Sequence, residues 1–89
     1  MSNKYDYRDD ETTVMILDPQ GTEIGTVIDV ESAETLIPYL DAGVGGFSIE
    51  PFVENEKREY AFVQDGSWVA YTDSETAAEA LISHLNRNG

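Results

Sequence analysis

The sequence predicts a single α+β domain in which a mainly antiparallel sheet is covered on one face by two helices, in the order ββαβββα. Short β-branched or alternating segments are separated by turn signals rich in Pro, Gly and Asp. Two further stretches carry apolar residues at helical spacing behind capping residues. The chain has 89 residues, of which 40% are hydrophobic, and this suffices for one small core.

The first eleven residues form a polar segment that ends in three consecutive acidic residues and has no hydrophobic periodicity. We expect a flexible acidic arm over 1–11 and a folded domain over 12–89. The start lacks the apolar region of a signal peptide, and no stretch reaches the roughly 18 apolar residues of a membrane span. We therefore expect a cytoplasmic protein.

The first elements expected after the arm are a hairpin and a helix. A β-branched run over 12–17 leads into an Asp-Pro-Gln-Gly sequence typical of a type I turn, and the alternating segment 22–30 returns antiparallel. A helix is expected over 32–42, with Ser32 as its N-cap. Pro38 is expected to kink it or to shift its start.

The second group begins with a strand over 47–53, in which Pro51 indicates an edge strand or a bulge. Strands over 58–64 and 67–71 follow. They are separated by an Asp-Gly pair, which predicts a type I′ hairpin turn.

A capping-box sequence at 72–75 opens the last helix, whose apolar stripe ends at Leu85. Residues 86–89 are expected to fray. The order strand, turn, strand, helix thus occurs twice, which indicates a degenerate ββα repeat with one extra strand between the halves. The alternative is that hairpins followed by helices are common in any small α+β protein.

If both helices cover one face of the sheet, alternate residues divide into two sets. The set expected to face the helices is Val14, Ile16, Ile24, Ile28, Phe47, Ile49, Tyr60 and Phe62. The set expected on the open face is Met15, Leu17, Val27, Phe52, Val63, Val69 and Tyr71. An open face this apolar is unusual for a solvated sheet. Either the arm or the Gly-rich loop at 43–46 covers it, or it forms a homodimer or partner interface.

The sequence contains no recognisable catalytic, cofactor or metal motif. Cysteine is absent, which excludes disulfides, thiolate nucleophiles and cysteine-bound zinc. The single histidine, His84, has no nucleophile at a suitable spacing. The Gly-rich loop at 43–46 follows a helix, the reverse of a phosphate-binding loop, and no calcium-loop spacing is present. We expect a protein that is not an enzyme and binds no cofactor or metal.

The net charge of −13, from 18 acidic and five basic residues, is the strongest functional signal. Carboxylates held close together repel one another, and either a basic partner or a high salt concentration can offset that repulsion. Glu75 and Glu79 are a like-charge pair one helical turn apart, without a nearby cation. The residues expected to contact a partner are Glu50, Glu54, Glu56, Glu59, Asp73, Glu75 and Glu79, with Phe52 or Tyr71 as an aromatic anchor.

In its small size, strong acidity and lack of catalytic motifs, the chain resembles phage-encoded DNA-mimic inhibitors, a class that includes inhibitors of uracil-DNA glycosylase, restriction enzymes and CRISPR effectors. The resemblance rests on size and charge and includes no sequence motif. It implies a non-enzymatic protein that docks on the basic, nucleic-acid-binding surface of an enzyme. Nucleic acids and membranes are themselves anionic, so direct binding to either is not expected.

The alternative is a small regulatory or adaptor domain adapted to the high-salt cytoplasm of a halophile. The chain has only two lysines, and its acidic residues are spread over nearly every loop. In that case the acidity reflects the solvent and carries no information about a partner.

Overall fold

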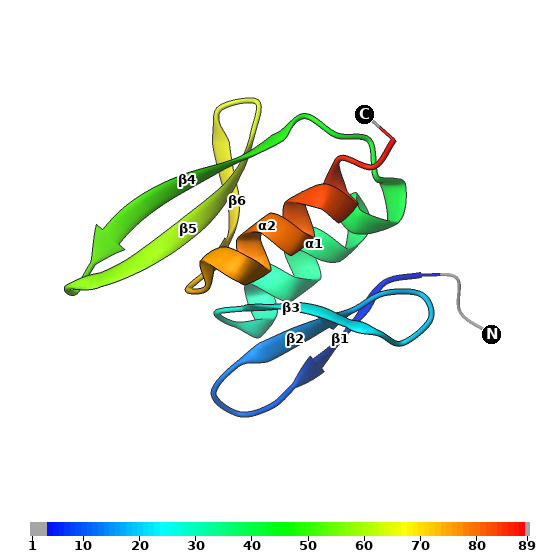
Figure 1. The fold of residues 1–89 in the computed structure, drawn as a ribbon, viewed down its shortest axis with the longest axis horizontal. Helices are drawn as coiled ribbons and strands as arrows, with labels where there is room; N and C mark the ends of the chain where they lie inside the picture. The colour runs from blue at the N-terminus through cyan, green and yellow to red at the C-terminus, as the bar shows by residue number, and fades with distance from the viewer. Residues whose placement is uncertain (1–3, 89) are drawn as a thin grey trace.

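The computed structural model of the chain describes residues 4–88 and confirms an α+β fold. The elements are β1 (Asp6–Asp9), β2 (Val14–Leu17), β3 (Glu23–Val27), α1 (Val30–Ala42), β4 (Phe47–Glu54), β5 (Lys57–Gln64), β6 (Ser67–Thr72) and α2 (Glu75–Leu85). The strands form two antiparallel sheets instead of one: β1-β2-β3, the first sheet, and β4-β5-β6, the second sheet. The two helices lie side by side between the sheets (Figure 1).

Each sheet is followed by one helix, so the chain consists of two βββα halves. The halves share an irregularity: the third strand of each sheet contains one unpaired residue, Ile24 in β3 and Val69 in β6. Such an extra residue is a β-bulge, which bends the strand and resets the alternation of its side chains. The strand over 47–53 is therefore not an extra strand between the halves, because its counterpart in the first half is β1.

Strand β1 lies within the segment expected to be a flexible arm. It pairs with β2 from Asp6 opposite Leu17 to Asp9 opposite Val14. Tyr5, just before it, is buried at 7% exposure, and its backbone N–H donates to the Asp41 carboxylate at 2.7 Å. The strand has no hydrophobic pattern because it lies at a sheet edge with mostly exposed side chains. Residues 1–3 of the predicted arm lie outside the described residues.

Tyr7 attaches β1 to the first helix. Its hydroxyl donates to the Glu34 carboxylate on α1 at 3.1 Å. This hydrogen bond raises the pKa of Tyr7 above its usual value of about 10. The bond therefore favours the folded state at lower pH, and this contribution is lost as the pH rises through the raised pKa.

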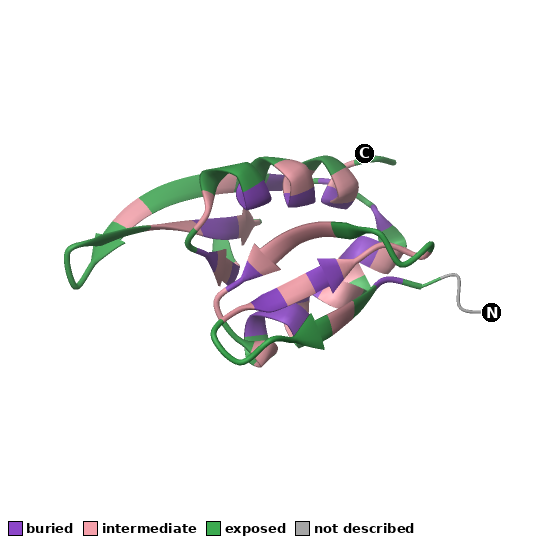
Figure 2. Ribbon diagram, turned by 60° about the horizontal axis from the view of Figure 1, so that its bottom comes forward, coloured by how far each residue is buried: buried purple, intermediate pink, exposed green. Residues whose placement is uncertain are grey.

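One hydrophobic core unites both sheets and both helices. Its largest fully buried side chains are Phe62, Ile16, Leu36, Leu40, Leu81, Leu85 and Val27. The strand that α1 contacts most is β6 of the second half, and the strand that α2 contacts most is β3 of the first, while each helix also packs on its own sheet. Figure 2 shows the buried positions of α2 on its side toward the first sheet. Gly25 permits this close packing, because a Cβ there would lie 3.2 Å from the Cα of Ala77, closer than most such contacts.

Both helices begin at residues other than the expected caps. The N-cap of α1 is Asp29, whose carboxylate accepts from the N–H of Ser32 at 2.8 Å. Ser32, the expected cap, is buried in the first turn. The N-cap of α2 is Ser74, whose hydroxyl accepts from the N–H of Ala77 at 3.2 Å. The capping-box assignment to Thr72 is therefore wrong, since Thr72 is the last residue of β6.

A single guanidinium binds the C-terminal ends of both helices. Arg87 donates to the carbonyl of Leu40, to that of Asp41 at 3.0 Å and to that of His84 at 2.8 Å. A cation is favourable at this position because the carbonyl ends of helices carry partial negative charge. Gly43 caps α1 at φ +59°, and a Cβ there would lie 2.7 Å from the Arg87 Cζ.

We predict that Gly43→Ala destabilises the protein more than Gly21→Ala. Both glycines have positive φ, and a Cβ at Gly21 meets nothing within 4 Å. Backbone strain alone gives a cost of about 1 kcal/mol for Gly21→Ala. Gly43→Ala should cost roughly 1 kcal/mol more, because Arg87 has to leave the helix carbonyls. Urea unfolding of both variants measures the difference, and equal costs would show that the Arg87 contact contributes nothing.

Candidate functional site

Three aromatic rings gather on the outer face of the second sheet, the face turned away from the helices. Phe52 of β4 lies with its ring centroid 5.0 Å from that of Trp68 and 5.9 Å from that of Tyr71, and the Trp68 and Tyr71 centroids are 6.1 Å apart. Simple alternation would place residues 68 and 71 on opposite faces. The bulge at Val69 brings both rings to the same face. Trp68 remains 44% exposed.

A cavity of about 300 Å³ opens beside these rings, and all three of them line it. Three acidic residues, Asp29, Glu54 and Glu59, also line it. Glu59 lies directly opposite Phe52 in the pairing of β4 with β5. Asp29 comes from the other half of the chain, at the start of α1. We call this site the aromatic–acidic cavity.

The cavity lies where the two halves of the chain meet. The backbone N–H of Tyr71 donates to the Ser32 hydroxyl at 3.3 Å, and its carbonyl accepts from the N–H of Ile28 at 3.1 Å. The buried Thr72 hydroxyl donates to the carbonyl of Thr26 at 2.7 Å. These bonds join the end of β6 to the end of β3 and the start of α1. They therefore hold Tyr71 in position beside Asp29.

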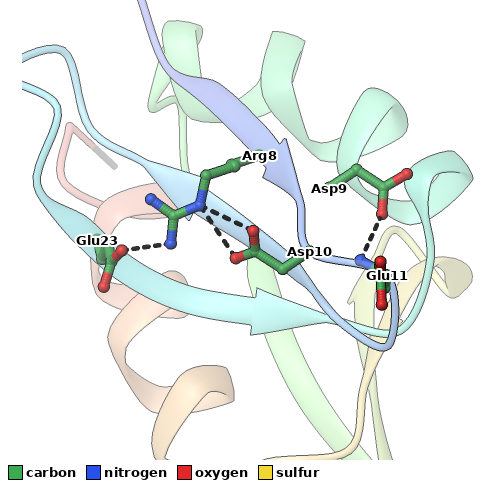
Figure 3. Close-up of polar contacts among 5 residues, drawn as sticks. All are labelled: Arg8, Asp9, Asp10, Glu11 and Glu23. Carbon is green, nitrogen blue, oxygen red and sulfur yellow. Dashed lines mark hydrogen bonds and ion pairs between the residues drawn. The ribbon is translucent and has the colours of Figure 1, made fainter.

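On the outer face of the first sheet, an arginine neutralises part of the acidic charge. Arg8 makes ion pairs there with Asp10, at 3.0 Å, and with Glu23 (Figure 3). Hydrogen bonds to Glu23 and Asp10 raise the pKa of Arg8, whose guanidinium stays charged at any physiological pH. Part of the acidic charge on this sheet is thus neutralised within the protein.

The carboxylates of the aromatic–acidic cavity lack such compensation. Among residues 4–88, neither Lys57 nor Arg58 is within ion-pair distance of Glu54 or Glu59. Lys57 lies across from Glu54 in the strand register without pairing with it. Negative charge beside apolar rings attracts cations more strongly than the same charge in open water.

The structure brings together only part of the predicted acidic contact surface. Glu54 and Glu59 line the cavity, and Glu50 lies on the same sheet face, across from Ala61. The other four are exposed at the β4–β5 turn, before α2 and along α2: Glu56, Asp73, Glu75 and Glu79. The β4–β5 hairpin extends away from the helices (Figure 1), so the acidic residues near its end lie on a projecting part of the molecule.

The seven apolar residues expected on one open face do not share a face. Phe52, Val63 and Tyr71 lie on the outer face of the second sheet. Met15 and Leu17 are half-buried in β2 of the first sheet. The expected apolar interface is thus divided between two sheets.

The remaining two placements are wrong, and the bulges are the cause. Val27 is a core residue at 1% exposure, and Val69 packs partly buried against the core. Ile28, expected to face the helices, lines the cavity instead. Sequence reasoning also missed Trp68 and Asp29 as site residues. The only signal for Trp68 was a large aromatic residue directly after a hairpin turn.

Other candidate chemistry is accounted for by packing. The His84 ring forms a hydrogen bond of 2.8 Å with the Tyr5 hydroxyl and an edge-to-face contact with its ring, which together fix the segment before β1. Within residues 4–88, no group of three or more acidic or histidine side chains is arranged to hold a metal ion. In the same part of the chain, no helix has the length and apolar character needed to cross a membrane.

Comparison with protein-family models, curated protein sequences and solved structures finds no match to this chain.

We predict that Thr72→Val destabilises the junction between the two halves. The change removes a buried hydroxyl that donates to the Thr26 carbonyl and accepts from the Ser74 N–H, at a cost of about 1–3 kcal/mol. Thr76→Val is the matched control, because Thr76 is exposed on α2 and should change stability by less than about 0.5 kcal/mol. Urea unfolding measures both, and an unchanged stability of Thr72→Val would contradict the importance of the junction.

Proposed function

We propose that the protein is a non-enzymatic, cytoplasmic binding domain that docks on the basic, nucleic-acid-binding surface of another protein and competes there with nucleic acid. The supporting observation is the aromatic–acidic cavity. Three carboxylates that make no ion pair within residues 4–88 line the same cavity as three clustered rings on the outer face of the second sheet. Protein interfaces typically combine aromatic anchors, which become buried on binding, with charged residues at the rim.

The chemistry of the proposed partner follows from the charge. Lysine and arginine side chains that bind phosphates are the natural complement of spaced carboxylates. Long-range attraction to a domain with a net charge of −13 would speed association, and added salt would slow it. The rings add an apolar contact, which salt does not weaken.

A second proposal, a regulatory or adaptor domain adapted to high salt, is favoured by the distribution of the other acidic residues. Exposed carboxylates also lie on the first sheet and on both helices, at Asp6, Asp9, Glu31, Glu34, Glu75 and Glu79. An even distribution of this kind is expected where charge serves hydration and solubility rather than one interface.

The first proposal predicts that the protein displaces DNA from at least one DNA-processing enzyme. The assay measures the fluorescence anisotropy of a labelled duplex bound to a uracil-DNA glycosylase, a restriction endonuclease or a CRISPR effector nuclease. We expect displacement at micromolar or lower concentration, weakening by roughly tenfold or more as salt rises from about 0.05 to 0.2 M.

Polyglutamate at equal total charge is the control for non-specific competition. Displacement by the protein must exceed that by polyglutamate. If no member of the panel releases its DNA more readily with the protein than with polyglutamate, the proposed competition with nucleic acid is contradicted.

A further inference from the structure

We infer that the aromatic–acidic cavity is a recognition site for one arginine side chain of a protein partner. The inference rests on the proposed function, because it names the chemical group through which a basic partner would be held. It concerns Phe52, Trp68 and Tyr71 together with the carboxylates of Asp29, Glu54 and Glu59, all of which line the same cavity.

The cavity presents two features that favour a cation. Aromatic faces attract cations through the negative charge of their π-systems, and tryptophan does so most strongly. Trp68 is 44% exposed, so part of its ring surface is free to take a ligand. Carboxylates on the same walls supply charge-assisted hydrogen bonds. An anionic or purely apolar ligand would meet three carboxylates that have no compensating ion pair.

The arrangement of the rings favours a planar cation over a spherical one. Quaternary ammonium groups bind inside cages of separated aromatic rings. Here the centroids are only 5.0–6.1 Å apart, so the rings pack against one another and leave no space for an ammonium group among them. A guanidinium can instead stack on the outside of such a cluster.

The positions of the carboxylates also suit a guanidinium. Glu59 lies directly across from Phe52, and Glu54 lies two residues beyond Phe52 on β4. Asp29 is on the other half of the chain, with one carboxylate oxygen already bound to the Ser32 N–H. Arginine has five donors in a rigid plane, whereas lysine has a compact ammonium. Several carboxylate acceptors beside a cluster of rings therefore favour binding of arginine over lysine.

A titration with single amino-acid derivatives tests this inference without a partner protein. Trp68 is the only tryptophan in the chain, so its indole N–H NMR signal reports on the cavity alone. N-acetyl-arginine amide, N-acetyl-lysine amide and N-acetyl-trimethyllysine amide are compared at constant ionic strength. We expect a saturable shift with the arginine derivative and affinities lower by roughly two- to fivefold or more for the other two.

Matched charge variants show whether the effect is local. Glu59→Gln should weaken binding of the arginine derivative several-fold. Asp6→Asn, which removes the same charge from the exposed edge strand of the first sheet, should leave it within about twofold, because exposed charges at a distance are screened. The inference is overturned if arginine and lysine derivatives shift Trp68 equally, if the two variants behave alike, or if trimethyllysine binds best.

The result is separable from that of the DNA-displacement assay. If the protein displaces DNA but Trp68 does not respond to arginine, the inference fails and the proposed function stands. If Trp68 responds selectively but no enzyme releases its DNA, the arginine site stands and the proposed competition with nucleic acid fails.

Discussion

The contact between the ends of β3 and β6 is the constraint on which the rest of this structure depends. Thr72 and Tyr71 bond there to Thr26, Ile28 and Ser32, so that the two βββα halves are joined where both helices begin. Each helix then packs on strands of both halves. Neither half alone could bury the apolar stripe of its helix in this way. The aromatic–acidic cavity also depends on this contact, because Asp29 comes from one half and the rings come from the other.

The two halves share a backbone plan but differ in the chemistry of their outer faces. The residue before the bulge is Glu23 in the first sheet and Trp68 in the second. The position of Arg8 in β1 corresponds by register to that of Glu50 in β4. On the first sheet, Arg8 therefore pairs with Glu23, while the equivalent positions of the second sheet hold an unpaired acid and an exposed ring. The outer face of the second sheet thus carries acidic charge that no cation of these strand positions neutralises.

The sequence predicts the helices, five of the six strands and the Asp65–Gly66 hairpin turn, because these depend on local periodicity and turn chemistry. It does not predict β1, whose residues are polar because the strand lies at an edge. Nor does it predict the bulges at Ile24 and Val69. A bulge moves every later residue of its strand to the sheet face opposite the one that simple alternation predicts. Alternation therefore places Val27 outside the core, where the structure buries it. Charge alone predicts Glu54 and Glu59 as contact residues. Trp68 reaches the site through the bulge at Val69, and Asp29 reaches it through the contact between the two halves of the chain.

Thermal unfolding as a function of KCl concentration tests the central claim, that the acidity forms a binding surface and is not an adaptation to salt. Circular dichroism would follow the transition from about 0.05 to 3 M KCl, a range that shortens the Debye length from beyond 10 Å to below 3 Å. A binding surface predicts a protein that is folded at the lowest salt, with a melting temperature that changes little. Loss of the fold at low salt, with recovery only in molar KCl, would contradict it.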